Sequence, residues 1–93
     1  MSILVRFTGA PSMSSEKYDA VLPTIEASGE WPPDGLDFHV AFTAGGSFRV
    51  SEIWDSEEKF EAFGQRLMPI LNDGGVELAG PPEILEIHNI IRR

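Results

Sequence analysis

The chain has 93 residues, of which 42% are hydrophobic, so it has the size of one small domain with a modest core. It contains no cysteine, which excludes disulfides, thiolate metal sites and a cysteine nucleophile. Its formal net charge of −8 repels phosphate backbones and anionic lipid, so we expect neither nucleic-acid nor membrane binding. The apolar run before Arg6 is too short for a signal peptide, so we expect a cytoplasmic protein.

The first third of the chain predicts a strand and a helix. Residues 2–8, "SILVRFT", are rich in β-branched and aromatic side chains, as strands are. Ser14 can cap a helix that ends at Gly29, and Pro23 should kink or split this helix because proline lacks an N–H donor. Residues 30–35, "EWPPDG", should form a stiff turn. The buried stripe of the helix should consist of Tyr18, Val21, Leu22 and Ile25.

A hairpin is predicted in the middle of the chain. Residues 36–44, "LDFHVAFTA", and residues 47–54, "SFRVSEIW", have the alternating pattern of strands. Gly45 and Gly46 separate them, and glycine accepts the positive φ angles that tight turns need.

The last part of the chain predicts a second helix and a final strand. Residues 56–72 have helical spacing and "NDGG" closes them, with Pro69 bending the last turn. Residues 83–91, "EILEIHNII", should form a strand that is apolar on both faces. The buried stripe of this helix should consist of Phe60, Phe63, Leu67, Met68 and Leu71.

This order of elements, βαββαβ, predicts an α+β fold of the ferredoxin-like type in a single domain, residues 1–93. Right-handed crossovers give a four-stranded antiparallel sheet in the order 4-1-3-2, with both helices on one face. The other face has no helix to cover it. Either it is polar and solvated, or a second subunit covers it.

The acidic stretch "SEIWDSEEKFEAF", residues 51–63, is mostly explained by the start of the second helix. Asp55 or Ser56 lies at the N-cap position, and Asp55 with Glu58 fits a capping box. Negative charge is also favourable near a helix N-terminus. Glu52 and Trp54 precede the cap, in a central strand, and a carboxylate buried there needs a partner.

The βαββαβ order, the "GLDFHVAF" strand, the "IWDSEEKFEAF" junction and the "PEILEIHNII" ending together resemble the dimeric α/β-barrel superfamily. Among its members, the chain is similar to small proteins related to antibiotic biosynthesis monooxygenases. The resemblance implies a homodimer in which two sheets pack face to face, and a pocket between sheet and helices in each subunit. Some members of the superfamily oxidise polycyclic aromatic substrates without a cofactor, and others degrade haem.

The sequence departs from this pattern at functional positions. Trp54 matches the tryptophan that ends a strand in the family, but many members have a histidine nine positions later, where this chain has Phe63. Residues 56–72 contain no histidine, so that helix cannot ligate haem. The asparagine that many of the monooxygenases have in the first strand is also missing. The resemblance therefore implies the fold more strongly than the activity.

The two histidines lie in different predicted strands. His39 is in the second strand and His88 in the fourth, at opposite edges of the sheet, so they cannot share a metal within one subunit. We expect no metal and no cofactor. His88 is interpreted as a structural or interface residue. Arg6 and Arg49, on adjacent central strands, are expected either to pair with acids across a dimer or to hold an anionic ligand.

The register of the hairpin decides which residue faces Glu52. If Gly45 and Gly46 alone form the turn, His39 lies opposite Glu52, with Trp54 on the same face of the sheet. This register places an imidazole against a carboxylate, which would make the imidazole a stronger base.

The alternative is a three-residue loop that includes Ala44. Every cross-strand pair then slips by one, so His39 meets Ser51, and Glu52 lies in the apolar core opposite Phe38. The slip would gather the apolar residues of both strands on one face of the sheet, which favours it, but burying the unpaired carboxylate of Glu52 would be costly. Because glycine pairs suit two-residue turns, we favour His39 opposite Glu52.

These observations lead to two functional hypotheses. In the first, a homodimer binds a small apolar, aromatic or polyketide-like molecule and acts as a cofactor-independent monooxygenase. His39 and Glu52 would be the catalytic residues, while Trp54, Tyr18 and Phe63 would bind the substrate. In the second, the protein is a non-enzymatic binding or stress-related dimer whose pocket is only core, and Tyr18 is a core tyrosine.

Overall fold

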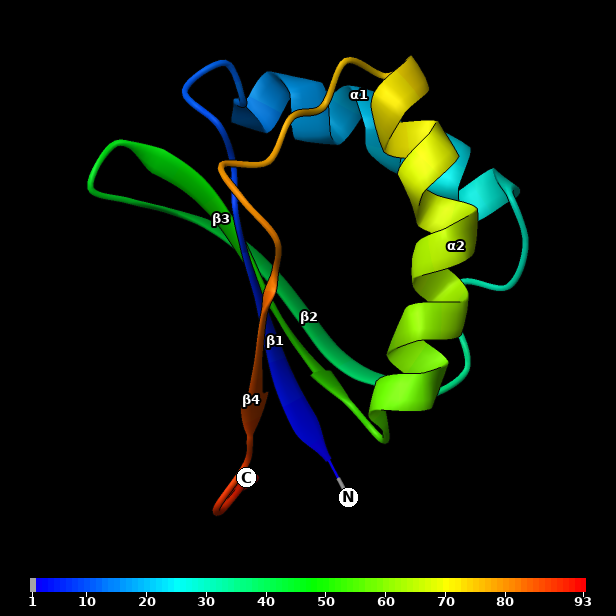
Figure 1. The fold of residues 1–93 in the computed structure, drawn as a ribbon, viewed down its shortest axis with the longest axis vertical. Coiled ribbons are helices and arrows are strands. Elements are labelled where there is room, and N and C mark those ends of the chain that lie inside the picture. The colour runs from blue at the N-terminus through cyan, green and yellow to red at the C-terminus, as the bar shows by residue number, and fades with distance from the viewer. Residues whose placement is uncertain (1) are drawn as a thin grey trace.

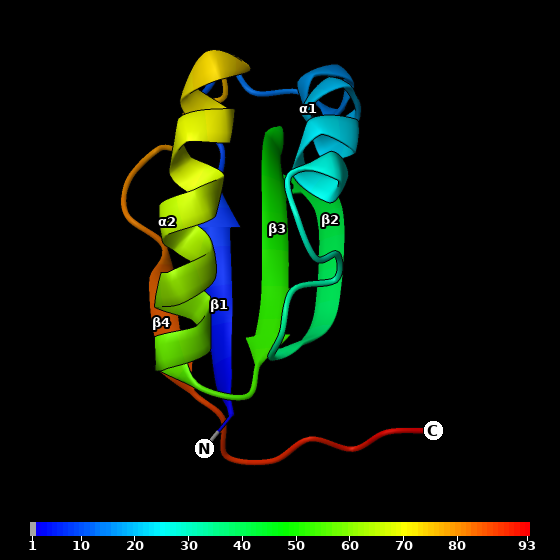
Figure 2. The same ribbon diagram turned by 90° about the vertical axis from the view of Figure 1, so that its right-hand side faces the viewer.

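The computed structural model describes residues 2–93 and has the predicted order of elements. Strands β1 (Ile3–Thr8), β3 (Ser47–Trp54), β2 (Leu36–Ala44) and β4 (Glu83–Glu86) form one antiparallel sheet in the order β2-β3-β1-β4. Helices α1 (Ser15–Ala27) and α2 (Glu57–Asp73) both lie on one face of this sheet (Figures 1 and 2). The α+β fold and the strand order 4-1-3-2 predicted from the sequence are therefore confirmed.

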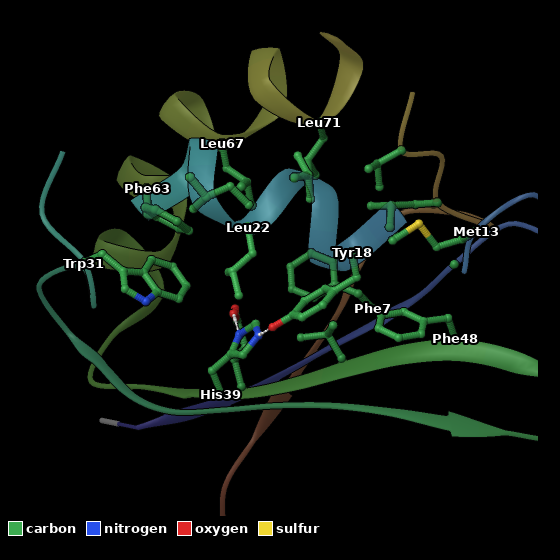
Figure 3. Close-up of a pocket in the computed structure, with 17 residues that line it drawn as sticks. Phe7, Met13, Tyr18, Leu22, Trp31, His39, Phe48, Phe63, Leu67 and Leu71 are labelled. Atoms are coloured by element: carbon green, nitrogen blue, oxygen red, sulfur yellow. Dashed lines mark hydrogen bonds and ion pairs between the residues drawn. The ribbon is translucent and has the colours of Figure 1, made fainter. Parts of the chain in front are cut away.

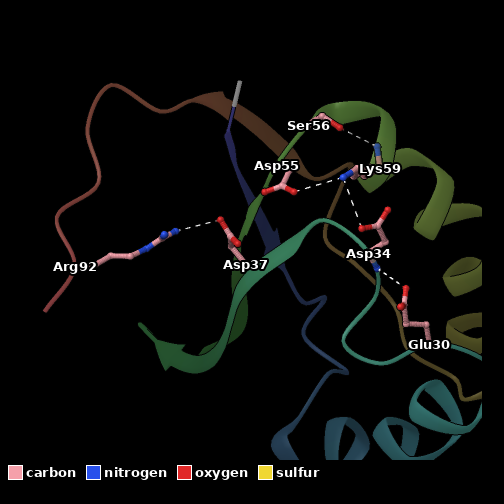
Figure 4. Close-up of polar contacts among 7 residues, drawn as sticks. All are labelled: Glu30, Asp34, Asp37, Asp55, Ser56, Lys59 and Arg92. Carbon is pink, nitrogen blue, oxygen red and sulfur yellow. Dashed lines mark hydrogen bonds and ion pairs between the residues drawn. The ribbon is translucent and has the colours of Figure 1, made fainter.

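Both helices begin at a serine cap. The Ser14 hydroxyl accepts a hydrogen bond from the Lys17 N–H at 3.3 Å, and the Ser56 hydroxyl accepts one from the Lys59 N–H at the same distance. The capping box predicted between Asp55 and Glu58 is wrong, because Ser56 is the N-cap. The Asp55 carboxylate lies instead 3.5 Å from the Lys59 ammonium group (Figure 4).

The two prolines inside the helices do not divide them. Pro23 lies inside α1 and Pro69 inside α2, and each helix is continuous through its proline. A split of the first helix, one of the two outcomes predicted for Pro23, does not occur.

Lys59 forms a second ion pair besides the one with Asp55. Its Nζ lies 3.6 Å from Oδ1 of Asp34, and this contact ties the loop before β2 to the first turn of α2 (Figure 4).

The hairpin has the two-residue turn. Gly45 and Gly46 have φ angles of 58° and 80°, the left-handed conformations that a type I′ turn requires at both central positions. Ala44 pairs with Ser47, and the pairing continues to His39 opposite Glu52. The favoured register is confirmed, and the slipped register that pairs His39 with Ser51 does not occur.

The last strand is shorter than predicted. The sequence predicted a strand over residues 83–91, but β4 ends at Glu86. The reason lies in its partner, because Glu86 pairs with Ile3, the first residue of β1, so the following residues have no strand beside them. The chain then leaves the edge of the sheet and crosses towards β2, where Arg92 contacts Asp37 at 3.1 Å (Figures 2 and 4).

The core lies between the sheet and the two helices. The alternation of side chains along the strands places one set of residues on this inner face, while the other set lies on the outer face. Leu67 is only partly buried and Met68 is 48% exposed, so the predicted stripe of α2 is too wide at Met68. The buried apolar residues are Val5, Val21, Ile25, Trp54, Phe60, Phe63, Leu71 and Val76.

Candidate functional site

A cavity of about 80 Å³ lies between the inner face of the sheet and the two helices (Figure 3). Side chains from β1, β2, β3, both helices and the loops beside them line it. The wall is almost wholly apolar, so a ligand there would gain mainly by leaving water. Apolar side chains that form this wall include Met13, Leu22, Phe48, Phe63, Leu67 and Leu71.

The polar part of this wall is a hydrogen-bonded group of three side chains. Glu52 is only 5% exposed, and its Oε2 lies 2.6 Å from Nδ1 of His39. Nε2 of the same imidazole lies 2.7 Å from the hydroxyl of Tyr18. The three groups come from β3, β2 and α1, so the contact joins the sheet to the first helix across the cavity (Figure 3).

The carboxylate of Glu52 fixes the arrangement of protons in this group. A carboxylate only accepts hydrogen bonds, so Nδ1 of His39 donates to it. In the neutral imidazole Nε2 is then the acceptor, and the Tyr18 hydroxyl donates to it. The second oxygen of Glu52 accepts a hydrogen bond from the Trp54 indole N–H at 3.0 Å. Glu52 is therefore buried with both of its oxygens paired, as a buried carboxylate requires.

The backbone explains why these side chains meet. The two-residue turn sets the register that puts His39 directly opposite Glu52, so both side chains point to the same face. Trp54 lies two residues further along β3 and therefore points to that face as well. Tyr18 belongs to the buried stripe of α1, in the same row as Val21 and Ile25, and so faces the sheet.

The hydroxyl of Tyr18 is held in its neutral form. Burial raises the pKa of Tyr18 above its ordinary value of 10.0, and the negative charges of Glu52, Asp19 and Glu26 raise the pKa further. The ring also packs against Phe48, with ring centres 5.2 Å apart. Tyr18 is therefore a proton-bearing hydroxyl at neutral pH, held in place by both packing and a hydrogen bond.

Four of the five predicted site residues lie at the cavity. His39, Glu52, Tyr18 and Phe63 are among its lining residues. Trp54 was expected to form a wall of the pocket, and the structure places it elsewhere. Its side chain has no exposed surface, because it packs beneath α2 against Phe60 and Phe63, with ring centres 5.7 Å and 5.6 Å away. Trp54 reaches the site only through its hydrogen bond to Glu52.

Trp31 was missed as a site residue. It lies in the proline-rich turn before β2, lines the cavity, and packs edge-on against His39 at 5.9 Å and against Phe63 at 6.2 Å (Figure 3). The sequence did offer a signal for it. Trp31 is a large aromatic residue followed by Pro32 and Pro33, whose fixed φ angles hold it in one place more firmly than a flexible loop would. Met13 and Phe48 were not singled out either.

His88 does not line this cavity. It follows the end of β4 on an exposed part of the chain, not within a strand as predicted. Within residues 2–93, no cluster of three or more histidine, aspartate or glutamate side chains is placed to hold a metal ion. No helix in the part of the chain that the structure describes is long and apolar enough to cross a membrane.

Comparisons with known proteins identify the fold. No family model matches the sequence, and no curated protein matches it. Among solved structures, a variant of SnoaB, a cofactor-independent oxygenase from Streptomyces nogalater, is similar with a TM-score of 0.64 and 11% sequence identity. That match covers 99% of this chain and 96% of that one.

Two further structures show the same similarity. A candidate antibiotic biosynthesis monooxygenase from Caulobacter crescentus has a TM-score of 0.59 and 15% identity, with 97% of this chain and 89% of that chain covered. A protein of unknown function from Nitrosomonas europaea has a TM-score of 0.54 and 20% identity, with 99% and 90% covered. The chain thus has the fold of the antibiotic biosynthesis monooxygenase-like proteins, and the resemblance seen in the sequence is confirmed at the level of the fold.

Proposed function

We propose that this protein, which has the fold of the antibiotic biosynthesis monooxygenase-like proteins, binds a small neutral aromatic or similarly apolar compound in the cavity beneath its helices. The observation that carries the proposal is the composition of the cavity wall. It is apolar on all sides except where Tyr18, His39 and Glu52 form a hydrogen-bonded group. Small-molecule sites typically combine an apolar wall with a few placed polar groups.

The volume of the cavity favours a ligand of one ring. Its roughly 80 Å³ is small beside the roughly 300–1,000 Å³ of most ligand pockets. A polycyclic or polyketide-like compound would fit only if side chains around the cavity moved. A single-ring aromatic compound is therefore our first choice of ligand.

The charges around the cavity favour a neutral ligand. Among residues 2–93, no lysine or arginine belongs to the lining, whereas the carboxylate of Glu52 does. The whole chain also carries a net charge of −8. A ligand with its own carboxylate or phosphate would be repelled and would lose its hydration without a partner. Arg6 and Arg49, considered above as anion ligands, do not line the cavity.

Cofactor-independent monooxygenation is the activity we propose for this site. His39, oriented by Glu52, would remove a proton from the bound compound, and the resulting electron-rich anion would react with O₂. One oxygen atom would replace two hydrogens of the ligand as a carbonyl, and the other would leave as water. The ligand itself would supply all the electrons, so no cofactor is required. The oxygenase activity stated for SnoaB on the same fold supports this proposal.

A non-enzymatic binding or stress-related protein is the second candidate, and one observation favours it. Nε2 of His39, the nitrogen that would accept the ligand's proton, already accepts the Tyr18 hydroxyl at 2.7 Å. A ligand could then be held in the cavity without any proton transfer to His39.

We also propose that the protein is a homodimer that uses the outer face of its sheet. Three aromatic or aliphatic side chains of β2 project from this face into solvent, namely Phe38, Val40 and Phe42. Apolar groups clustered on one face commonly mark an interface. Sedimentation at micromolar concentration should give twice the chain mass, and a monomer at all concentrations would contradict the proposal.

Thermal unfolding in the presence of single-ring phenols tests the binding function. A ligand that binds only the folded state raises the melting temperature, and the rise grows with the logarithm of the ligand concentration divided by its Kd. Leu22→Phe would fill the cavity, and Leu85→Phe makes the same change on the outer face, where Leu85 does not line the cavity. We expect phenols to stabilise the wild type and Leu85→Phe, but not Leu22→Phe.

Equal stabilisation of all three proteins, or of none, would contradict binding in the cavity. Oxygen consumption with the phenols that bind then separates the two candidate functions. Consumption that depends on His39 supports the oxygenase, and binding without consumption supports the non-enzymatic protein.

A further inference from the structure

The contact between Tyr18 and His39 carries an inference about how a ligand meets this site. When the imidazole of His39 is neutral, the Tyr18 hydroxyl donates its only proton to Nε2 of His39, with 2.7 Å between the two atoms. Its oxygen keeps lone pairs that can accept a hydrogen bond, and Tyr18 lines the cavity. The described cavity wall thus offers a ligand an acceptor at Tyr18, while Nε2 of His39 is already hydrogen-bonded to the Tyr18 hydroxyl (Figure 3).

We propose that Tyr18 is the residue that contacts the ligand, that it selects compounds bearing a phenolic or enolic hydroxyl, and that it relays the hydroxyl proton to His39. This inference rests on the proposed binding function, and it adds the chemical group that the ligand must carry. A ketone, ether or nitrile has no proton to donate to the tyrosine oxygen. A hydroxyl has one, so the site distinguishes a phenol from its methyl ether.

The relay moves two protons and no electrons. The hydroxyl proton of the ligand moves to the oxygen of Tyr18 as the phenolic proton of Tyr18 moves to Nε2 of His39. The O–H bond of the ligand breaks and an N–H bond forms on the imidazole, while Tyr18 ends as it began, neutral. The products are a ligand anion and an imidazolium, and no oxidant or reductant is needed for this step.

The groups behind His39 are arranged to stabilise the imidazolium. Glu52 accepts from Nδ1 at 2.6 Å, so the positive charge forms directly beside a carboxylate. Trp54 donates to the other oxygen of Glu52 at 3.0 Å and holds the carboxylate in line with the imidazole. Glu52 and Trp54 are positioning residues in this scheme, because they act through His39.

The neutral form of Tyr18 suits this role. Burial and the carboxylates of Glu52, Asp19 and Glu26 raise the pKa of Tyr18, so the residue keeps a proton to pass on. A tyrosinate at this position would repel the ligand anion that the step creates. The same carboxylates also oppose an anion in the cavity, so the ligand must enter neutral and ionise only after it contacts Tyr18.

The probe for this inference is 4-nitrophenol, because its ionised form absorbs visible light and its neutral form does not. Tyr18→Phe removes only the hydroxyl and keeps the ring that packs on Phe48. At one pH, we expect the bound probe to be ionised at least tenfold more, as a ratio of ionised to neutral form, in the wild type than in Tyr18→Phe. Equal ionisation in the two proteins would overturn the relay and leave His39 to act directly.

A second measurement needs no variant. The methyl ether of the probe, 4-nitroanisole, has the same ring but no proton to donate, and we expect it to bind the wild type at least tenfold more weakly. Equal affinity would overturn the selection for a hydroxyl. If neither compound binds the wild type, the proposed binding function itself fails. Tighter binding of the phenol than of its methyl ether, without ionisation of the phenol, would remove only the relay.

Discussion

The two faces of the sheet each hold a side chain in an unusual environment, a buried glutamate on the inner face and an exposed phenylalanine on the outer face. On the inner face, the carboxylate of Glu52 is 5% exposed. On the outer face of the neighbouring strand, the ring of Phe38 is 56% exposed. In most folded proteins a glutamate stays in water and a phenylalanine is buried, so each exception needs a reason. Glu52 has two hydrogen-bond partners that make its burial tolerable, whereas nothing in residues 2–93 covers Phe38.

The two exceptions have one origin. Side chains alternate along β2, so the register that turns His39 inward must turn Phe38 and Val40 outward. A slip by one residue would bury both apolar side chains and leave Glu52 without its imidazole. The register observed thus keeps the polar group of the site together and leaves an apolar surface on the other face. Our proposals of a partner on the outer face and a ligand on the inner face both rest on this difference.

The largest effect should come from placing a charge on the outer face. In a symmetric dimer Phe38→Glu acts twice, removing apolar contact and bringing like charges together. We expect it to weaken the dimer by about 3 kcal/mol, roughly 100-fold in Kd, measured by sedimentation at a series of concentrations. Gln65→Glu, which adds the same charge on the exposed side of α2, should leave the mass unchanged. A Phe38→Glu protein that remains a dimer would place the interface elsewhere.

On the inner face, removal of the carboxylate should destabilise the fold. Glu52→Ala leaves the indole N–H of Trp54 and Nδ1–H of His39 without their acceptor. An unsatisfied buried donor costs about 1–3 kcal/mol, so we expect a loss of about 2–3 kcal/mol in the free energy of unfolding. Glu83→Ala, on the exposed outer face beside Arg6, should change it by less than about 0.5 kcal/mol. Urea unfolding of the three proteins measures both values, and equal losses would contradict the contrast between the faces.

Local signals in the sequence were sufficient for the hairpin. The bounds of β2 and β3, the turn at Gly45 and Gly46, and the pair of His39 with Glu52 all follow from residues that are close in sequence. A glycine pair and the alternation of a strand each involve only a few neighbouring residues, so the sequence of this chain was enough to predict the hairpin.

Features that depend on distant segments could not be predicted in this way. The end of β4 depends on where β1 begins, because Glu86 pairs with Ile3, and residues 87–91 look like a strand whether or not a partner strand continues. Alternation placed Trp54 on the inner face correctly. Whether it lined the cavity or the core depended on how α2 packs over the sheet, which periodicity does not specify. Trp31 reaches the cavity from a loop, where no periodicity operates.

The turn between β2 and β3 determines which side chains lie on each face of the sheet, and adding one methyl group to it should lower the stability of the protein. Gly46 has a φ of 80°, which L-residues with a side chain rarely adopt, so Gly46→Ala should cost about 1 kcal/mol of stability. Gly64 lies inside α2 with open space around its Cα, so Gly64→Ala should stabilise by about 0.5–1 kcal/mol. The same substitution is thus expected to have opposite signs at the two sites. Stabilisation by Gly46→Ala, measured by thermal unfolding, would contradict the type I′ turn.

The smallest effect is the dependence of stability on alkaline pH. Burial and the neighbouring carboxylates raise the pKa of Tyr18 above 10.0 in the folded protein, so between the unfolded and folded values the folded state holds a proton that the unfolded state has lost. This contribution is fully present below pH 10.0 and is lost as the pH rises through the folded pKa. Tyr18→Phe should therefore lose less stability than the wild type over this range, as measured by urea unfolding at a series of pH values.

Tyr18 is the only tyrosine in the chain, so the ultraviolet absorbance of tyrosinate reports its ionisation without interference. We expect the titration of the folded protein to lie above that of the same chain in urea, where the hydroxyl meets only water. Glu52→Gln should move the folded titration towards the unfolded one, because it removes one of the charges that raise this pKa while an amide still fills the space beside His39. A folded titration at or below the unfolded one would mean that the hydroxyl of Tyr18 faces solvent, away from His39, and the inner face would then lack the group that joins the helix to the sheet.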